Sequence, residues 1–279
     1  MKIIISHDVD HLYNTDHLFR DIIFPKLIVR SFLHLLEKKI SIKTFWCRLR
    51  SLFEKRLNRI HEVMEIDKKY GVQSTFYFGM NQGLGMSYRP DEAKDVIRKV
   101  AEKGFDVGVH GIEFQNVEGI KKEHRLFKEI SSQKIFGIRT HYVRFDEQTF
   151  FKFAEAGYMY DTSEFNKQKL EIKAPYKIGN MWEFPLHIMD GYIVPFGDLE
   201  TGKQNTIEAI QKAKEMDMPY CTILYHDYQY NEKTYPVEKQ WYDWLLEYLC
   251  KNGYEFISYN QAIKELEEQN GKQRDNICE

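Results

Sequence analysis

The chain lacks three features that would each indicate a particular class of protein: a long apolar run, a CxxC pair and a large net charge. No run of apolar residues approaches the roughly 18 that a membrane-spanning helix needs. The four cysteines include no CxxC pair, which argues against a cysteine-based metal or redox motif and fits a reducing compartment. A net charge of -2 argues against a general nucleic-acid binder. At 279 residues, the chain is long enough for one large α/β domain.

Basic residues are concentrated in one segment near the N-terminus. Between Arg20 and Arg59 there are eleven Lys or Arg and three Asp or Glu, a local charge of +8, so the rest of the chain carries -10. Apolar residues recur at helical spacing within residues 17–60 and are interrupted by Pro25, which predicts a basic helical insertion at about 13–57. The alternative is a basic amphipathic surface that rests on an anionic membrane or holds an acidic substrate.

Outside that segment, short apolar runs alternate with helical patterns. This alternation is typical of a parallel sheet with helices outside, either open or an incomplete barrel. We expect one domain over residues 1–268, a strand-poor region around Pro175, Pro185 and Pro195, a last helix at 261–268 and a polar tail at 269–279. The predicted strands are 2–6, 74–78, 105–110, 136–139, 220–225 and 254–257.

Polar side chains of a few types follow four of these predicted strands. They are Asp8 and Asp10, then His110, then Arg139 and His141, and finally His226 and Asp227. Because the carboxyl ends of parallel strands meet at one edge, we interpret these residues as one active site rather than as four unrelated structural features.

The residue types suit hydrolysis assisted by a metal. Asp and His together fit a borderline divalent metal such as zinc, which in catalytic sites has about three protein ligands and one open position. A further carboxylate can take a proton from the attacking water, and a separate histidine can give one to the leaving group. An arginine beside that carboxylate would orient it. The sequence holds a candidate for each part.

The order of these motifs resembles the polysaccharide deacetylase family, carbohydrate esterase family 4, over roughly Lys2 to Asn260 apart from the insertion. The resemblance implies a distorted (β/α) barrel with about seven parallel strands and a metal-dependent hydrolase. It assigns Asp8 as base, Asp10 and His110 as metal ligands, and Arg139 as the residue that positions the base. The five motifs are His7-Asp8-Val9-Asp10, His110-Gly111-Ile112-Glu113-Phe114, Arg139-Thr140-His141-Tyr142, Trp182-Glu183-Phe184-Pro185 and Leu224-Tyr225-His226-Asp227, the last with His226 as the acid.

Two positions depart from the family pattern. Phe114 stands where the family has its second metal histidine, and His141 stands where it has a proline. Phe114 cannot bind a metal, so we predict His141 as the third ligand because it adjoins the arginine at a strand end. The alternatives for that ligand are Glu113, His11, His7 and His124.

Three residues are predicted to bind substrate. The resemblance implies that the main-chain amide of Tyr142 helps to bind the oxyanion. Trp182 either stacks on a sugar or packs in the core, and Asp227 either tunes His226 or caps the following turn.

The resulting hypothesis is a hydrolase that removes an N-acyl (acetyl) group from an amino sugar of a surface polysaccharide or its precursor. A weakened or inactive sugar-binding relative is one alternative, and a deformylase or cyclic-amide hydrolase of a small molecule is another. The expected partner is an N-acylated sugar or glycan precursor, and we expect no binding to nucleic acid. The sequence does not predict the oligomeric state. Since the apolar run Met1–Ser6 is too short for a signal peptide, we expect a cytoplasmic protein, or one peripheral to the inner face of the membrane.

Overall fold

The computed structural model describes residues 1–17 and 21–275. Arg20 of the basic segment, Cys278 and the end of the predicted tail lie outside the described residues. The strands are β1 (Lys2–Val9), β2 (Thr75–Gly79), β3 (Asp106–Gly111), β4 (Ile138–Thr140), β5 (Tyr160–Asp161), β6 (Tyr176–Ile178), β7 (Met181–Glu183), β8 (Ile188–Met189) and β9 (Tyr220–Leu224). The α-helices are α1 (Ile23–Leu36), α2 (Ile42–Ser51), α3 (Ile60–Lys69), α4 (Pro90–Glu102), α5 (Val117–Ser131), α6 (Thr149–Ala156), α7 (Asp190–Ile193), α8 (Leu199–Glu215), α9 (Pro236–Lys251) and α10 (Tyr259–Asp275), and the 3-10 helices are η1 (Asn14–Asp16), η2 (His141–Val143) and η3 (Asp227–Gln229).

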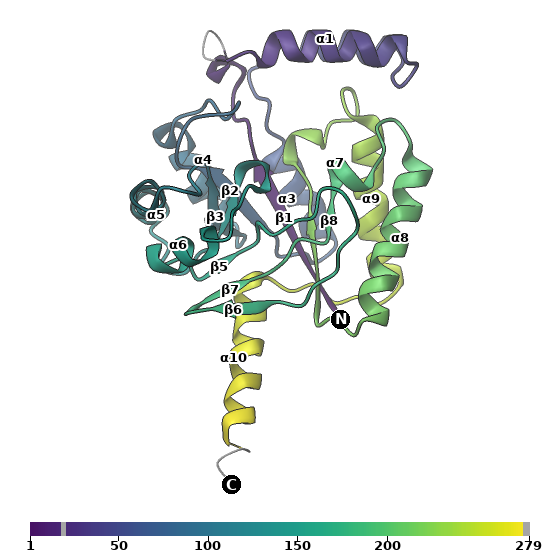
Figure 1. The fold of residues 1–279 in the computed structure, drawn as a ribbon. Coiled ribbons are helices and arrows are strands. Elements are labelled where there is room, and N and C mark those ends of the chain that lie inside the picture. The colour runs from purple at the N-terminus through teal and green to yellow at the C-terminus, as the bar shows by residue number, and fades with distance from the viewer. Residues whose placement is uncertain (18–20, 276–279) are drawn as a thin grey trace.

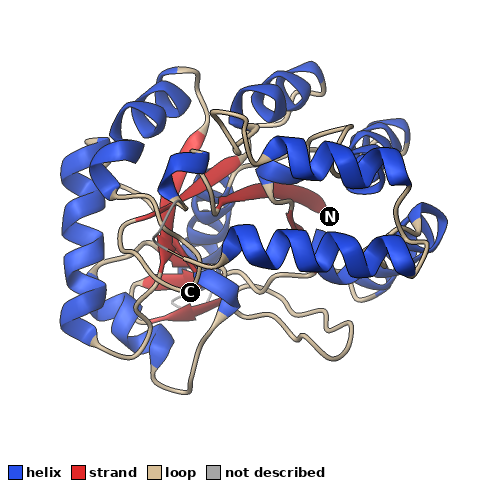
Figure 2. Cartoon of the chain, turned by 90° about the horizontal axis from the view of Figure 1, so that it is seen from above, coloured by secondary structure: helices blue, strands red, loops and turns tan. Residues whose placement is uncertain are grey.

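One mixed sheet of nine strands forms the centre of the molecule, in the order β6-β7-β5-β4-β3-β2-β1-β9-β8. All neighbouring strands are parallel except β6 and β7, which are antiparallel. The sheet curls into a half-barrel, and helices cover its outer side (Figures 1 and 2). The predicted distorted (β/α) barrel is therefore confirmed. No helix among the described residues combines the length and the apolar character needed to cross a membrane.

The secondary structure differs from the prediction in three places. The sheet has nine strands rather than about seven: β5 matches no predicted strand, and β6, β7 and β8 lie in the region expected to be poor in strands. These strands have only two or three residues, too few for an alternating pattern to be recognised. The predicted strand 254–257 is wrong, because Phe256 forms only an isolated bridge with Ile3. The last helix is longer than predicted and includes the first residues of the expected tail.

The alternation of side chains along β1 sends neighbouring residues to opposite sides of the sheet. Ile3 and Ile5 pack in the core between the sheet and the outer helices, whereas Ile4 packs in the interior of the half-barrel. His7 points to the helical side and Asp8 to the interior. The start of the first motif therefore belongs partly to the outer core and partly to the site.

His7 joins β1 to the helices that cover it. Its Nε2 lies 3.0 Å from Asp67 Oδ2 on α3, and Asp67 also accepts hydrogen bonds from Ser74 Oγ (2.5 Å) and from Tyr242 Oη (2.6 Å) on α9. All four side chains are buried. This network fixes the outer face of the strand whose inner face carries Asp8.

We predict that Asp67→Ala lowers the free energy of unfolding by about 3–5 kcal/mol, because it removes the shared acceptor of three buried donors. Urea denaturation measures the change. Asp67→Asn keeps one acceptor oxygen and should lose clearly less. An alanine variant within about 1 kcal/mol of the parent would contradict the importance of this network.

Candidate active site

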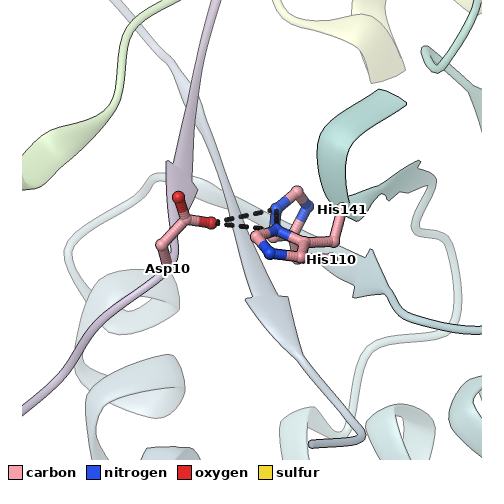
Figure 3. Close-up of side chains that lie close together, drawn as sticks. All are labelled: Asp10, His110 and His141. Atoms are coloured by element: carbon pink, nitrogen blue, oxygen red, sulfur yellow. Dashed lines mark hydrogen bonds and ion pairs between the residues drawn. The ribbon is translucent and has the colours of Figure 1, made fainter. Parts of the chain in front are cut away.

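The carboxyl ends of β1, β3 and β4 bring Asp10, His110 and His141 together (Figure 3). Asp10 follows β1, His110 lies near the end of β3, and His141 follows β4. Asp10 Oδ1 lies 3.2 Å from His110 Nε2 and 3.3 Å from His141 Nδ1, and the two ring nitrogens are 3.0 Å apart. Asp10 and His110, the two ligands that the resemblance implies, therefore lie together with His141, the predicted third ligand.

Main-chain carbonyls fix the orientation of both imidazole rings. Nδ1 of His110 donates to the Arg139 carbonyl at 3.0 Å, because a carbonyl can only accept. That contact follows from the register, in which His110 and Arg139 are partners on β3 and β4. Nε2 of His141 likewise donates to the Leu84 carbonyl at 3.3 Å. The other two ring nitrogens, Nε2 of His110 and Nδ1 of His141, then face Asp10.

The three inward-facing atoms are suited to a cation. Two ring nitrogens 3.0 Å apart cannot both carry a proton toward each other, so at least one of them offers a lone pair. Asp10 Oδ1 is a buried oxygen with no hydrogen-bond partner of its own. Burial raises the pKa of Asp10, but His141 and His110 more than offset this and hold the pKa well below its usual range. Ligand atoms about 3.3 Å apart are also what a tetrahedral zinc with bonds of ~2.0–2.1 Å requires.

A buried ion pair lies beside this cluster. Arg139 Nη1 donates to Asp8 Oδ1 at 2.9 Å, and Asp8 Oδ2 lies 3.7 Å from His110 Nε2. Arg139 also donates to Ser6 Oγ at 2.7 Å, and its guanidinium stacks over the Tyr77 ring at 4.6 Å. Burial lowers the pKa of Arg139, but Asp8 outweighs this and the pKa is raised. The arginine thus stays charged and holds the carboxylate in one orientation.

His226 lies on the other side of the cluster. Its Nε2 is 3.9 Å from Asp10 Oδ2, and its Nδ1 is 2.8 Å from Asp190 Oδ1. Asp190 also accepts the main-chain N–H of His226 at 2.7 Å. Burial lowers the pKa of His226, but Asp190 outweighs this and raises it to about 10. Since 18% of the His226 side chain is exposed, it can reach a ligand that enters from solvent.

Sequence reasoning missed Asp190 and considered Asp227 in its place. Asp227 is buried, and its Oδ2 accepts the main-chain N–H of Arg59 at 2.7 Å. Burial raises the pKa of Asp227 to about 8. A fully buried carboxyl group that bonds to the chain near α3 is not placed to bind substrate, so that prediction is corrected. Asp190 does follow a strand, but β8 has only two residues and gives no recognisable pattern.

The two carboxyl groups provide a matched comparison. Asp190→Asn should lower kcat by about 10- to 100-fold, as found for carboxylates that orient metal-binding histidines, because it removes the charge that favours protonated His226. Asp227→Asn should lower kcat by less than about threefold, because asparagine resembles the neutral acid that burial already favours. Steady-state kinetics on both variants tests this. Equal losses would contradict the assignment of Asp190.

Trp182 is also placed differently from one of its two predicted roles. It is 5% exposed, packs in the interior of the half-barrel with residues such as Phe184 and Tyr259, and donates from Nε1 to Glu267 Oε1 on α10 at 2.8 Å. Its placement corrects the prediction of substrate binding and matches the core alternative. Trp182 is buried because residues at the start of α10, such as Tyr259 and Ala262, pack in the same cluster.

Tyr142 lies beside the cluster in a strained conformation. Its φ of 62° is in the left-handed region, and the next residue, Val143, has φ 44°. The Tyr142 ring contacts the His141 ring with centroids 4.1 Å apart, and its hydroxyl donates to the Leu84 carbonyl at 3.1 Å. With 57% of its surface exposed, Tyr142 lies where a ligand would enter.

The other candidates for the third ligand lie apart from the cluster. His7 is bound to Asp67, and His124 packs against Phe136 in the helical layer. His11 follows Asp10 directly, but its ring contacts His17, and burial lowers its pKa to about 4. Among the described residues, the metal-binding geometry joins only Asp10, His110 and His141.

No protein-family model matches the chain, and a comparison with curated proteins found no match. Several solved structures share the fold. A candidate polysaccharide deacetylase from Mycobacterium smegmatis is 12% identical over 96% of this chain and 90% of its own, with a TM-score of 0.61. The allantoinase PuuE is 13% identical over 92% and 87%, with a TM-score of 0.58. A mutant CE4-family pseudoenzyme with restored activity is 12% identical over 93% and 66%, with a TM-score of 0.50. The resemblance to polysaccharide deacetylases is thereby confirmed for the fold.

Proposed function

We propose that the chain is a metal-dependent hydrolase of the polysaccharide deacetylase family that removes an N-acyl group, such as acetyl, from an amino sugar of a surface polysaccharide or its precursor. One observation carries the proposal. Two imidazole nitrogens and a carboxylate oxygen converge within 3.0–3.3 Å, with an Asp–Arg pair on one side and an Asp–His pair on the other. A metal site that only stabilised the fold would need the three ligands but neither of the two flanking pairs.

Asp10, His110 and His141 would hold the metal. Three neutral or anionic ligands of this kind suit zinc and leave room for a further ligand. When bound, such a metal supplies a water of lowered pKa and polarises the acyl carbonyl. Phe114 stands where the family has its second metal histidine. In this proposal His141, which follows the neighbouring strand β4, takes the place of that ligand.

The residues around the cluster supply the proton transfers. Asp8 takes a proton from the water that attacks the carbonyl carbon, and Arg139 keeps Asp8 pointed at the cluster while it does so. The main-chain amide of Tyr142 is the proposed donor to the oxyanion. His226, held by Asp190, gives a proton to the nitrogen as the C–N bond breaks. The products are a carboxylic acid and a free amine, and each of the four residues has one task.

Two other functions remain as alternatives. A sugar-binding relative without activity was suggested by Phe114, but it would not need both a base and an acid beside a complete ligand set. A cyclic-amide hydrolase is favoured by one observation, the similar fold of an allantoinase. That reaction would use the same base, acid and metal, so the two enzymatic functions differ only in the substrate.

Substrate profiling separates these functions. The purified protein, supplied with zinc, would be incubated with N-acetylated and N-formylated amino sugars and with allantoin and hydantoin. Mass spectrometry would follow the loss of the acyl group from the sugars and the gain of one water by the cyclic amides, with Asp8→Asn as the blank. Turnover of N-acetyl sugars alone supports the proposal. Turnover of the cyclic amides alone would replace it with the second function, and no turnover by a metal-loaded protein would favour the binding relative.

A further inference from the structure

Helices α1 and α2 form a helical hairpin that turns apolar side chains to solvent. The two helices pack against each other, and α1 lies across the top of the molecule in Figure 1, beyond the carboxyl ends of the strands, whereas α10 lies at the opposite end. Nine of the seventeen large hydrophobic side chains exposed among the described residues lie between Ile22 and Phe53. Apolar patches of this density mark interaction sites on soluble proteins. We call this surface the hairpin face.

On α1 the apolar residues form a continuous stripe. Pro25, Val29, Phe32 and Leu36 are spaced three or four residues apart and therefore share one side of the helix. Val29, Phe32 and Leu36 are 59%, 51% and 63% exposed. Ser31, on the opposite side, is buried. The helix thus carries apolar side chains on its outer side as well as on the half-buried inner side that includes Phe24 and Leu27.

On α2 the pattern is the same. Ile42 and Trp46 are one turn apart and are 67% and 57% exposed, and Phe53, just after the helix, is 91% exposed. Lys43 and Arg50 are exposed and border this apolar side. The two helices lie side by side (Figure 2), and each turns large apolar side chains to solvent.

The inner side of the hairpin is fixed to the rest of the molecule. Arg48 is 2% exposed, donates from Nε to the Thr234 carbonyl at 2.8 Å and lies over the Tyr235 ring at 4.7 Å. His34 stacks on Phe196 with ring centroids 3.8 Å apart. The outward direction of the hairpin face is therefore set by specific contacts.

The charge around the hairpin face indicates what covers it. The segment carries +8 in a chain of net charge -2, and Lys26, Arg30, Lys43 and Arg50 are exposed. A second copy of the chain would bring two basic surfaces together, which electrostatic repulsion opposes. We propose that the hairpin face docks on an anionic lipid bilayer, with its apolar side chains at the boundary between headgroups and acyl chains and its basic side chains on the headgroups.

The inner side of the hairpin borders the candidate active site. Ile23 of α1 lies against Gly85, where an added Cβ would be 3.3 Å from Ile23 Cδ1. The neighbouring Leu84 carbonyl accepts hydrogen bonds from His141 and Tyr142. Docking would therefore place the site on the side of the molecule that faces the bilayer. The proposal does not depend on the reaction carried out there.

Co-sedimentation of the full chain with vesicles tests the proposal. We expect binding to phosphatidylcholine vesicles that contain phosphatidylglycerol, and much weaker binding to phosphatidylcholine alone or at high salt. Lys26→Glu with Lys43→Glu should weaken binding about 25-fold or more, at about fivefold for each basic side chain lost. Phe32→Ser with Trp46→Ser should weaken it at least tenfold.

A matched control uses exposed apolar residues outside the hairpin. Ile135 and Phe151 are 53% and 61% exposed, and changing both to Ser should leave vesicle binding unchanged. Circular dichroism checks that each variant is folded. Absence of binding to anionic vesicles, equal binding to neutral ones, or self-association that Phe32→Ser with Trp46→Ser abolishes while vesicles are ignored would each overturn the proposal.

Discussion

Asp8→Asn is expected to lower kcat by roughly 10²–10⁴ while the metal stays bound, because asparagine cannot take the proton of the attacking water. Asp8 is the carboxylate that Arg139 orients at 2.9 Å, and it is not part of the ligand cluster. Steady-state kinetics and metal analysis on the same preparation measure both properties. Retained activity within about threefold of the parent would contradict the role of Asp8 as base.

The same substitution leaves Arg139 buried without its counter-ion, which costs about 3–5 kcal/mol of stability. A lower rate must therefore be separated from unfolding. Ser6→Ala is the matched control, because it removes the 2.7 Å hydrogen bond to Arg139 without touching the base. It should lose about 1 kcal/mol of stability and little of the rate.

His226→Gln should lower kcat for amide substrates by roughly 10²–10⁴, since the leaving amine then departs without a proton donor. An aryl ester of acetic acid provides an internal comparison. Its leaving phenolate is stable without a proton, so the same variant should lose much less activity toward it. Equal losses on the amide and the ester would show that His226 does not act as the acid.

The sequence predicts the parts of the site that long strands deliver. β1, β3 and β9 have five to eight residues, and Asp8, Asp10, His110 and His226 could be placed from their ends. His141 could be predicted as well, because it follows Arg139 where a parallel strand ends. These residues needed only the rule that such strands end at the same edge.

The rest of the site depends on contacts that no local pattern encodes. Asp190 reaches His226 from a two-residue strand, and the Leu84 carbonyl orients His141 from a loop 57 positions away in the sequence. Trp182 is buried because the first turns of α10 pack against it, which the pattern of that helix does not reveal. The strands β5 to β8 could not be predicted because each has only two or three residues.

Metal content is the most direct test of the central claim, that Asp10, His110 and His141 bind a divalent metal. Elemental analysis would compare the parent chain with an alanine variant at each position and with His61→Ala, an exposed histidine outside the site. We expect about one metal per chain in the parent and in His61→Ala. The other three should lose at least about tenfold in affinity and therefore keep well under one metal per chain after dialysis against metal-free buffer. A parent chain that stays free of metal when zinc is supplied, or a His141→Ala variant that keeps its full content, would contradict the claim.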